Sequence, residues 1–176
     1  MENEIKAAQI ATETGTRRAT WPAMTTDEQA AFAQHAHLVD LAASIAMQAF
    51  AGKLDRSGYP KVLHSLRVGA AGKTWQTMVV GFLHDVLEDT DTSPSMLRAN
   101  FDVDIMRALD SVTRVPGETY RAFINRSNAN DIGREVKKTD LKDNLARLYQ
   151  LPLAEAESLR RAYRNALATL GEDACP

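Results

Sequence analysis

Residues 74–90 read TWQTMVVGFLHDVLEDT, an apolar helical segment that runs into a cluster of ionisable side chains. Thr74 is of a residue type that caps helix N-termini. The apolar residues that follow are spread around most of a helix surface, at positions 78, 79, 82, 83, 86 and 87. A helix that is apolar on most sides is buried, so we expect this segment in the core.

The ionisable cluster at the end of this segment consists of His84, Asp85, Glu88 and Asp89. Residues three and four apart share a helix face, so these side chains would crowd one another. Carboxylates are disfavoured at a helix C-terminus, where the helix dipole is negative. The pattern indicates a metal site, and a solvated helix end is the alternative.

The rest of the chain predicts further helices and no strand of any length. A capping box of Thr26 and Gln29 predicts a long helix that ends at Gly52, and Asp131 is expected to cap another. The other expected helices cover 64–71, begin at Ser93-Pro94, cover 103–112 and 118–125, and begin at Pro152. The fold class is therefore all-α, a single compact helical domain over 25–172, with 1–24 as an arm or short helix.

Composition narrows the function classes. The chain has 176 residues, of which 44% are hydrophobic and 25% are charged, and this composition excludes a wholly disordered chain. The net charge of -2 gives little support for binding nucleic acid. The single cysteine, Cys175, excludes a disulfide framework or a cysteine zinc cage within one chain. Neither a signal peptide nor a membrane span is predicted, so we expect a cytoplasmic protein.

Two more residues extend the predicted metal site. His64 follows a polar loop, and Asp140 lies on the polar face of a predicted helix. Together with His84 and Asp85 they offer two nitrogen and two oxygen ligands, a set that suits Mn, Fe, Ni or Zn. The remaining histidines, at 35 and 37, face different sides of their helix and are interpreted as structural or surface residues.

Three ordered motifs carry a resemblance to a known family. They are GYPKVLH at 58–64, HDVLEDT at 84–90 and VKKTD at 136–140, followed by Asn144. Across about residues 30–150 the sequence resembles the HD-domain metal-dependent phosphohydrolases, in particular the Rel/SpoT hydrolase domain and the small alarmone hydrolases. The HD dipeptide alone is unspecific, whereas the ordered set with these intervals is specific.

The resemblance implies an enzyme that releases pyrophosphate from the 3′ position of (p)ppGpp. It implies one metal ion, usually Mn²⁺, held by His64, His84, Asp85 and Asp140. It further implies that a metal-bound water attacks the 3′-diphosphate and that Glu88 and Asp89 position and activate this water. Asn144 would contact the nucleotide. The basic residues expected to hold phosphates by charge are Lys53, Arg56, Lys61 and Lys137.

Three departures from the family pattern occur, at Asp55, at Ser65 and at Lys138-Thr139, and the first of them bears on the substrate. Asp55 stands where the family has an arginine that stacks on guanine, and Arg56 lies beside it. The substrate class therefore includes, as alternatives, another nucleotide such as ppApp, NADPH or a nucleoside monophosphate. A noncatalytic nucleotide sensor is the third hypothesis. The apolar faces near both termini are compatible with a homo-oligomer as well as with closure of the core.

Overall fold

The computed structural model describes residues 25–172. The chain divides into two units, residues 1–33 and residues 34–176. In the first unit the described residues begin helix α2, and in the second they form the helical body that carries the site. The prediction for residues 1–24 lies outside the described residues.

The described chain is all-α, as expected. Its only pairing of strand type is an isolated bridge between Leu54 and Pro60. The elements are α2 (Thr26–Ala49), α3 (Val62–Ala70), α4 (Trp75–Leu83), α5 (Val86–Asp89), α6 (Pro94–Arg98), α7 (Val103–Val112), α8 (Tyr120–Asn128), α9 (Asp131–Ala146), the 3₁₀ turn η1 (Leu148–Gln150) and α10 (Leu153–Thr169). No helix among these is long and apolar enough to cross a membrane.

The helix caps confirm some predictions and correct others. Thr74 caps α4 as expected, by accepting the N–H of Thr77. The capping box of α2 lies one residue earlier than predicted, because Thr25 and Glu28 exchange the capping hydrogen bonds. Asn130, not Asp131, caps α9, because its side chain accepts the N–H of Gly133.

The segment from Thr74 to Asp89 is not one helix, which corrects the prediction. α4 ends at Leu83, and α5 begins after Asp85. The Nδ1–H of His84 donates to the carbonyl oxygen of Gly81 at 2.8 Å, and that oxygen would accept the N–H of Asp85 in a continuous helix. Glu88 and Asp89 therefore end a separate helix of a single turn, rather than a long helix whose C-terminal dipole would disfavour them.

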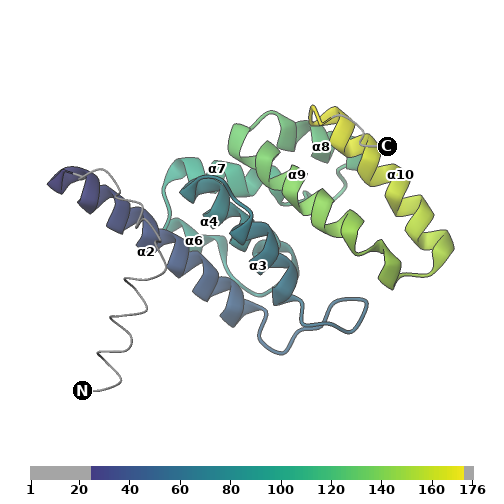
Figure 1. Ribbon diagram of the computed structural model, residues 1–176, viewed down its shortest axis with the longest axis horizontal. Coiled ribbons are helices and arrows are strands. Elements are labelled where there is room, and N and C mark those ends of the chain that lie inside the picture. The colour runs from purple at the N-terminus through teal and green to yellow at the C-terminus, as the bar shows by residue number, and fades with distance from the viewer. Residues whose placement is uncertain (1–24, 173–176) are drawn as a thin grey trace, which may run out of the picture. The chain divides into compact units, whose positions relative to one another are not determined.

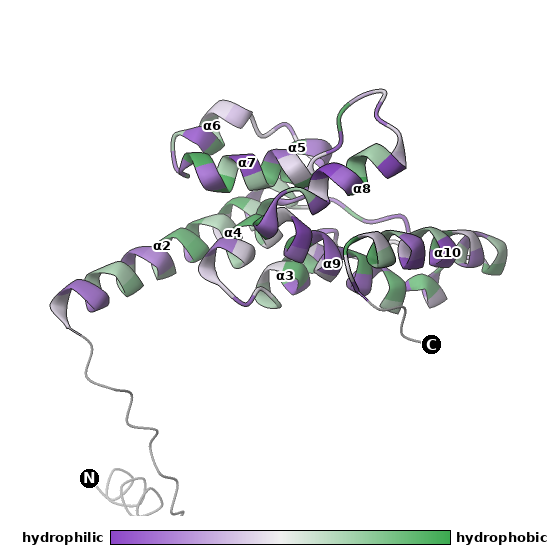
Figure 2. Ribbon diagram, turned by 90° about the horizontal axis from the view of Figure 1, so that it is seen from above, coloured by the Kyte–Doolittle hydropathy of each residue, from purple (hydrophilic) through white to green (hydrophobic). Residues whose placement is uncertain are grey.

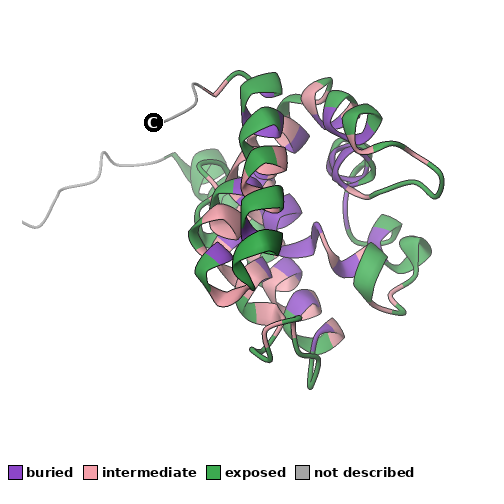
Figure 3. Cartoon of the chain, turned by 90° about the vertical axis from the view of Figure 1, so that its right-hand side faces the viewer, coloured by how far each residue is buried: buried purple, intermediate pink, exposed green. Residues whose placement is uncertain are grey.

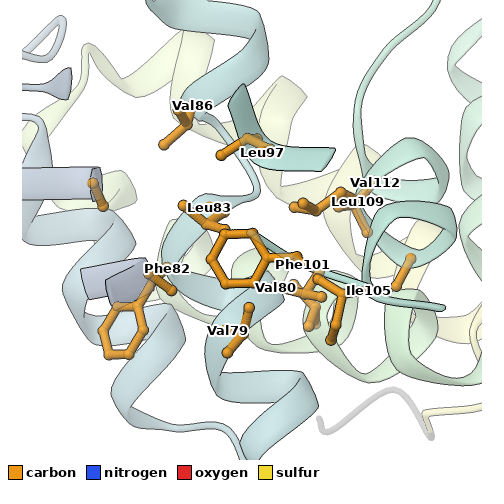
Figure 4. Packing of buried hydrophobic residues seen from close by; sticks show 14 of the residues in the cluster. Val79, Val80, Phe82, Leu83, Val86, Leu97, Phe101, Ile105, Leu109 and Val112 are labelled. Atoms are coloured by element: carbon orange, nitrogen blue, oxygen red, sulfur yellow. The ribbon is translucent and has the colours of Figure 1, made fainter. Parts of the chain in front are cut away.

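The core surrounds α4, as its sequence predicts. Val79, Val80 and Leu83 are completely buried. Figure 4 shows them packed among side chains of α6 and α7 such as Leu97 and Leu109. A second cluster joins α8, α9 and α10, and it contains Phe123, Ile124, Leu141, Ala166, Leu167 and Leu170. In Figure 3 the buried residues lie on the facing sides of the helices, and the exposed residues lie on their outer sides.

Helix α9 connects the two clusters. It contacts α3, α4, α7, α8 and α10, and it lies between α4 and α10 in Figure 1. Figure 2 shows that α9 carries both hydrophilic and hydrophobic residues along its length. This central helix can therefore bury Leu141 against α10 and still present Asp140 to α3 and the α4–α5 junction.

Close packing of α3 on α4 depends on two helical glycines. A Cβ atom at Gly69 would overlap the Phe82 ring, and one at Gly81 would lie 2.9 Å from the Cα of Gly69. We expect Gly69→Ala to destabilise the fold by about 1–3 kcal/mol, because overpacking outweighs the gain of about 1 kcal/mol in helix propensity. Urea unfolding measures this change.

The control is Ala70→Ser at the neighbouring exposed position of α3, which should change the free energy of unfolding by less than about 0.5 kcal/mol. A Gly69→Ala protein as stable as the parent would contradict this packing.

Candidate active site

The four predicted metal ligands lie together, although they come from three parts of the chain. Nε2 of His64 lies 3.2 Å from Nε2 of His84 and 3.1 Å from Oδ1 of Asp140. One ligand atom from each of these residues falls within 4.8 Å of the others. Asp85 joins them, with an oxygen 3.3 Å from Nε2 of His84. Two imidazole nitrogens and two carboxylates converging in this way fit a divalent cation.

Each histidine is oriented through its other ring nitrogen. Nδ1–H of His84 donates to the Gly81 carbonyl, and Nδ1–H of His64 donates to Oδ2 of Asp143 at 2.7 Å. Arg67 donates to both oxygens of Asp143, at 2.5 and 2.9 Å. The sequence reasoning missed Asp143. Its spacing of three from Asp140 on the polar face of the helix was the available signal.

Asp140 is almost completely buried and has several polar partners. Its oxygens accept hydrogen bonds from Lys137 at 2.7 Å and from Asn144 at 2.5 Å. Burial disfavours the charged forms of Lys137 and Asp140, but their attraction overrides it. The pKa of Asp140 therefore lies below its ordinary value and the pKa of Lys137 lies above its own. The carboxylate thus stays ionised, as a metal ligand must.

The pKa of His64 makes the stability of the metal-free protein depend on pH. Burial favours the neutral ring, but Asp140, Asp143 and Asp85 together raise the pKa of His64 from 6.5 to about 9. A folded-state pKa above the unfolded value gives stability that is complete below pH 6.5 and is lost as the pH rises through about 9. Urea unfolding in chelator, at pH values across this window, should show that loss.

The control for this pH dependence is His64→Gln, which cannot be protonated and should flatten it. A parent protein equally stable at both ends of the window would contradict the assignment.

The two acids predicted to be catalytic stand at the same site in different surroundings. Oε1 of Glu88 accepts the backbone N–H of Arg114 at 2.6 Å. Burial raises the pKa of Glu88, and the nearby Asp85 adds to the effect. Asp89 forms an ion pair with Lys61 at 2.5 Å. Glu88 is therefore the acid whose surroundings favour accepting a proton.

A cavity of about 490 Å³ opens over these residues. His64, Asp85 and Asp140 lie in its wall, together with both predicted catalytic acids. The predicted substrate-binding residues that line it are Arg56, Lys61, Lys137 and Asn144, whereas Lys53 does not line it. Lys53 instead donates to the backbone oxygen of Asp89 at 3.1 Å. The structure thus brings most of the predicted set together and places Lys53 behind Asp89.

Two arginines in the cavity wall were not predicted as site residues. Arg114 comes from the loop after α7, and Arg147 follows α9. Arg147 donates to Oδ2 of Asp55 at 2.9 Å, while Oδ1 of Asp55 accepts the N–H groups of Ser57 and Tyr59. Asp55 therefore anchors its own loop and holds Arg147. These partners lie 92 residues apart, so no local pattern could pair them.

Comparison with known proteins finds relatives named as guanosine-3′,5′-bis(diphosphate) 3′-pyrophosphohydrolases and others named as GTP pyrophosphokinases, such as one of Mycobacterium leprae that is 29% identical over 65% of this chain. A guanosine-3′,5′-bis(diphosphate) 3′-pyrophosphohydrolase of Aquifex aeolicus is 25% identical over 130 residues, 67% of this chain. An enzyme of the same name from Borreliella burgdorferi is 33% identical over 78 residues, 42% of this chain. Over these segments the chain is similar to enzymes of this name. No family model matches the sequence.

A similarity to a solved structure concerns the fold. A solved structure described as "A metazoan ortholog of SpoT hydrolyzes ppGpp and plays a role in starvation responses" superposes with a TM-score of 0.57 and 20% identity, over 86% of each chain. By contrast, the chain spans only 19% of the Aquifex protein and 12% of the Borreliella protein. The sequence similarity therefore concerns a small part of those longer enzymes.

Proposed function

We propose that this chain is a metal-dependent (p)ppGpp 3′-pyrophosphohydrolase. The observation that carries the proposal is one cavity that holds His64, Asp85 and Asp140, with His84 behind them and Glu88 beside them. Similarity to enzymes named as pyrophosphohydrolases supports the substrate class. Residues 25–172 would form the HD hydrolase domain. A cytoplasmic location and a homo-oligomer remain predictions.

The metal in this proposal is Mn²⁺, held by His64, His84, Asp85 and Asp140, and the same donors would also accept Fe, Ni or Zn. A bound divalent cation lowers the pKa of a water molecule and offsets charge on a phosphoryl oxygen. In the net reaction, the water oxygen bonds to the phosphorus that carries the 3′ oxygen, the bond from that phosphorus to the 3′ oxygen breaks, the 3′ oxygen takes up a proton to become a hydroxyl, and pyrophosphate is released.

The acids of the cavity have separate roles in the proposal. Glu88 accepts the proton from water, since burial raises its pKa. Asp89, held by its ion pair with Lys61, orients that water. Asn144 donates to Asp140 and lies in the cavity wall one helical turn away, where it can contact the nucleotide.

Phosphate groups need cations that are not already neutralised. Lys61, Lys137, Arg56 and Arg147 each form an ion pair with a carboxylate. Arg114 also lines the cavity, and within residues 25–172 it has no such carboxylate partner. We therefore add Arg114 to the residues that bind substrate phosphate.

A second candidate substrate is another nucleotide, because Asp55 replaces a family arginine. Its carboxylate accepts hydrogen bonds from two backbone N–H groups and from Arg147, so its contacts hold the loop rather than supply a cation to stack on a base. Arg56 is tied to Glu155 at 2.9 Å on the surface. Selection of guanine over adenine therefore has no dedicated side chain among these loop residues, which favours testing ppApp and NADPH together with ppGpp.

The test is turnover by the full chain after metal removal and addition of Mn²⁺, followed by anion-exchange chromatography. The proposal expects ppGpp to give GDP and pyrophosphate, and pppGpp to give GTP and pyrophosphate. Turnover of ppApp, NADPH or a nucleoside monophosphate alone would support the second candidate and reject the first. Nucleotide binding without turnover under any of Mn²⁺, Fe²⁺, Ni²⁺ or Zn²⁺ would favour a noncatalytic sensor.

A further inference from the structure

We infer that Asp143, held by Arg67, is a positioning residue that fixes the imidazole of His64 with Nε2 directed at the metal centre. This inference rests on the metal site of the proposed function. It adds two residues that neither the motifs nor the expected ligand set contain.

The geometry places Asp143 behind His64 rather than among the ligands. Its Oδ2 accepts Nδ1–H of His64 at 2.7 Å, while Nε2 on the other side of the ring lies 3.1 Å from Asp140. With Nδ1–H donated to Asp143, Nε2 is the ring nitrogen left for a cation. A carboxylate in this position also makes the imidazole a more basic ligand.

Arg67 keeps Asp143 in this role. Its Nε donates to Oδ1 and its terminal nitrogen donates to Oδ2, so the guanidinium holds the carboxylate in a two-pronged contact. Both oxygens are then occupied, and Asp143 cannot turn toward the centre. The side chain of Asp143 is only 14% exposed, so water does not compete freely for these contacts.

Two helices supply the arrangement through matching spacings. α3 carries His64 and Arg67 three residues apart, and α9 carries Asp140 and Asp143 three residues apart. Residues at this spacing share a helix face, and α3 packs on α9. The packing of α3 on α9 therefore places His64 beside Asp140 and Arg67 beside Asp143 at the same time.

His64 and His84 differ in the group that accepts the hydrogen bond from their Nδ1–H. The Nδ1–H of His84 donates to the neutral backbone carbonyl of Gly81, which stays in place whatever side chains are changed. His64 depends on a side chain that can be substituted. A substitution of Asp143 should therefore weaken metal binding although all four proposed ligands are kept.

The experiment measures the Mn²⁺ dissociation constant of the Asp143→Asn protein. An asparagine that keeps its oxygen toward His64 must turn its NH₂ group toward Nε–H of Arg67, so it cannot keep both contacts. We expect Mn²⁺ to bind roughly 10–100-fold more weakly than to the parent. Arg67→Gln, which keeps the hydrogen bond between His64 and Asp143, should give a smaller loss.

The matched control is Asp104→Asn, which breaks the exposed ion pair between Asp104 and Arg107 at the same spacing on α7. It should bind Mn²⁺ as the parent does. Nitrogen NMR of the imidazoles in the metal-free proteins gives a second readout. The hydrogen-bonded Nδ1–H signal of His64 should be the same in the parent and the control and should shift or disappear in Asp143→Asn, because a neutral amide is a weaker acceptor than a carboxylate.

The outcomes separate this inference from the proposed function. Parent-like Mn²⁺ affinity and an unchanged His64 signal in Asp143→Asn would overturn the inference and leave the metal site standing. A parent that binds no Mn²⁺ would overturn the proposed metal, and the His64 signal would still decide whether Asp143 positions the ring. A lower melting temperature with unchanged affinity would make the contact merely structural and also reject the inference.

Discussion

Replacing Asp140 with asparagine should abolish metal-dependent hydrolysis and also weaken the fold. The substitution removes a ligand charge from the centre, and turnover should fall by at least about 10³-fold. It also leaves Lys137 buried without its anionic partner, which lies 2.7 Å away in the parent. Breaking a buried pair in this way costs about 3–5 kcal/mol. Turnover, Mn²⁺ binding and urea unfolding measure the three effects.

A double variant separates the catalytic effect from the structural one. Asp140→Asn combined with Lys137→Met removes both charges, so stability should recover while Mn²⁺ binding and turnover stay lost. Asp131→Asn, at an exposed ion pair with Arg134 on the same helix, is the control and should leave all three measurements unchanged. Turnover by the double variant at the parent rate would contradict the assignment of Asp140 as a ligand.

Glu88→Gln should remove catalysis while leaving the metal in place. Glutamine can still accept the N–H of Arg114 through its oxygen, so the local fold is kept. It cannot accept a proton from water, and turnover should fall by about 10²–10⁴-fold. Mn²⁺ affinity and the melting temperature should match those of the parent, because Glu88 is not among the proposed ligands.

Glu157→Gln is the control for this prediction, because Glu157 is an exposed glutamate on α10. Full turnover by Glu88→Gln would remove Glu88 from the mechanism. The same variant distinguishes an enzyme from a sensor, because a noncatalytic sensor would have no turnover to lose and would bind nucleotide equally well before and after the change.

Local chemistry explains why much of the fold could be predicted. The apolar surface of residues 75–83 places α4 in the core, and Thr74 caps it as expected. The errors are also local. His84 takes the Gly81 carbonyl and ends α4, and neighbouring residues Thr25 and Asn130 outcompete the predicted caps. Competition between adjacent hydrogen-bond acceptors is not visible in a hydrophobic pattern.

The sequence by itself determined the helical class and the types and order of the candidate ligands, because these follow from side-chain chemistry and periodicity. Only the tertiary structure decided that Asp143 and Arg67 stand behind His64, that Lys53 lies behind Asp89, and that Arg147 pairs with Asp55. These partners are separated by 36 to 92 residues. Helix packing brings them together, and helix packing depends on the shapes of whole faces rather than on any local spacing.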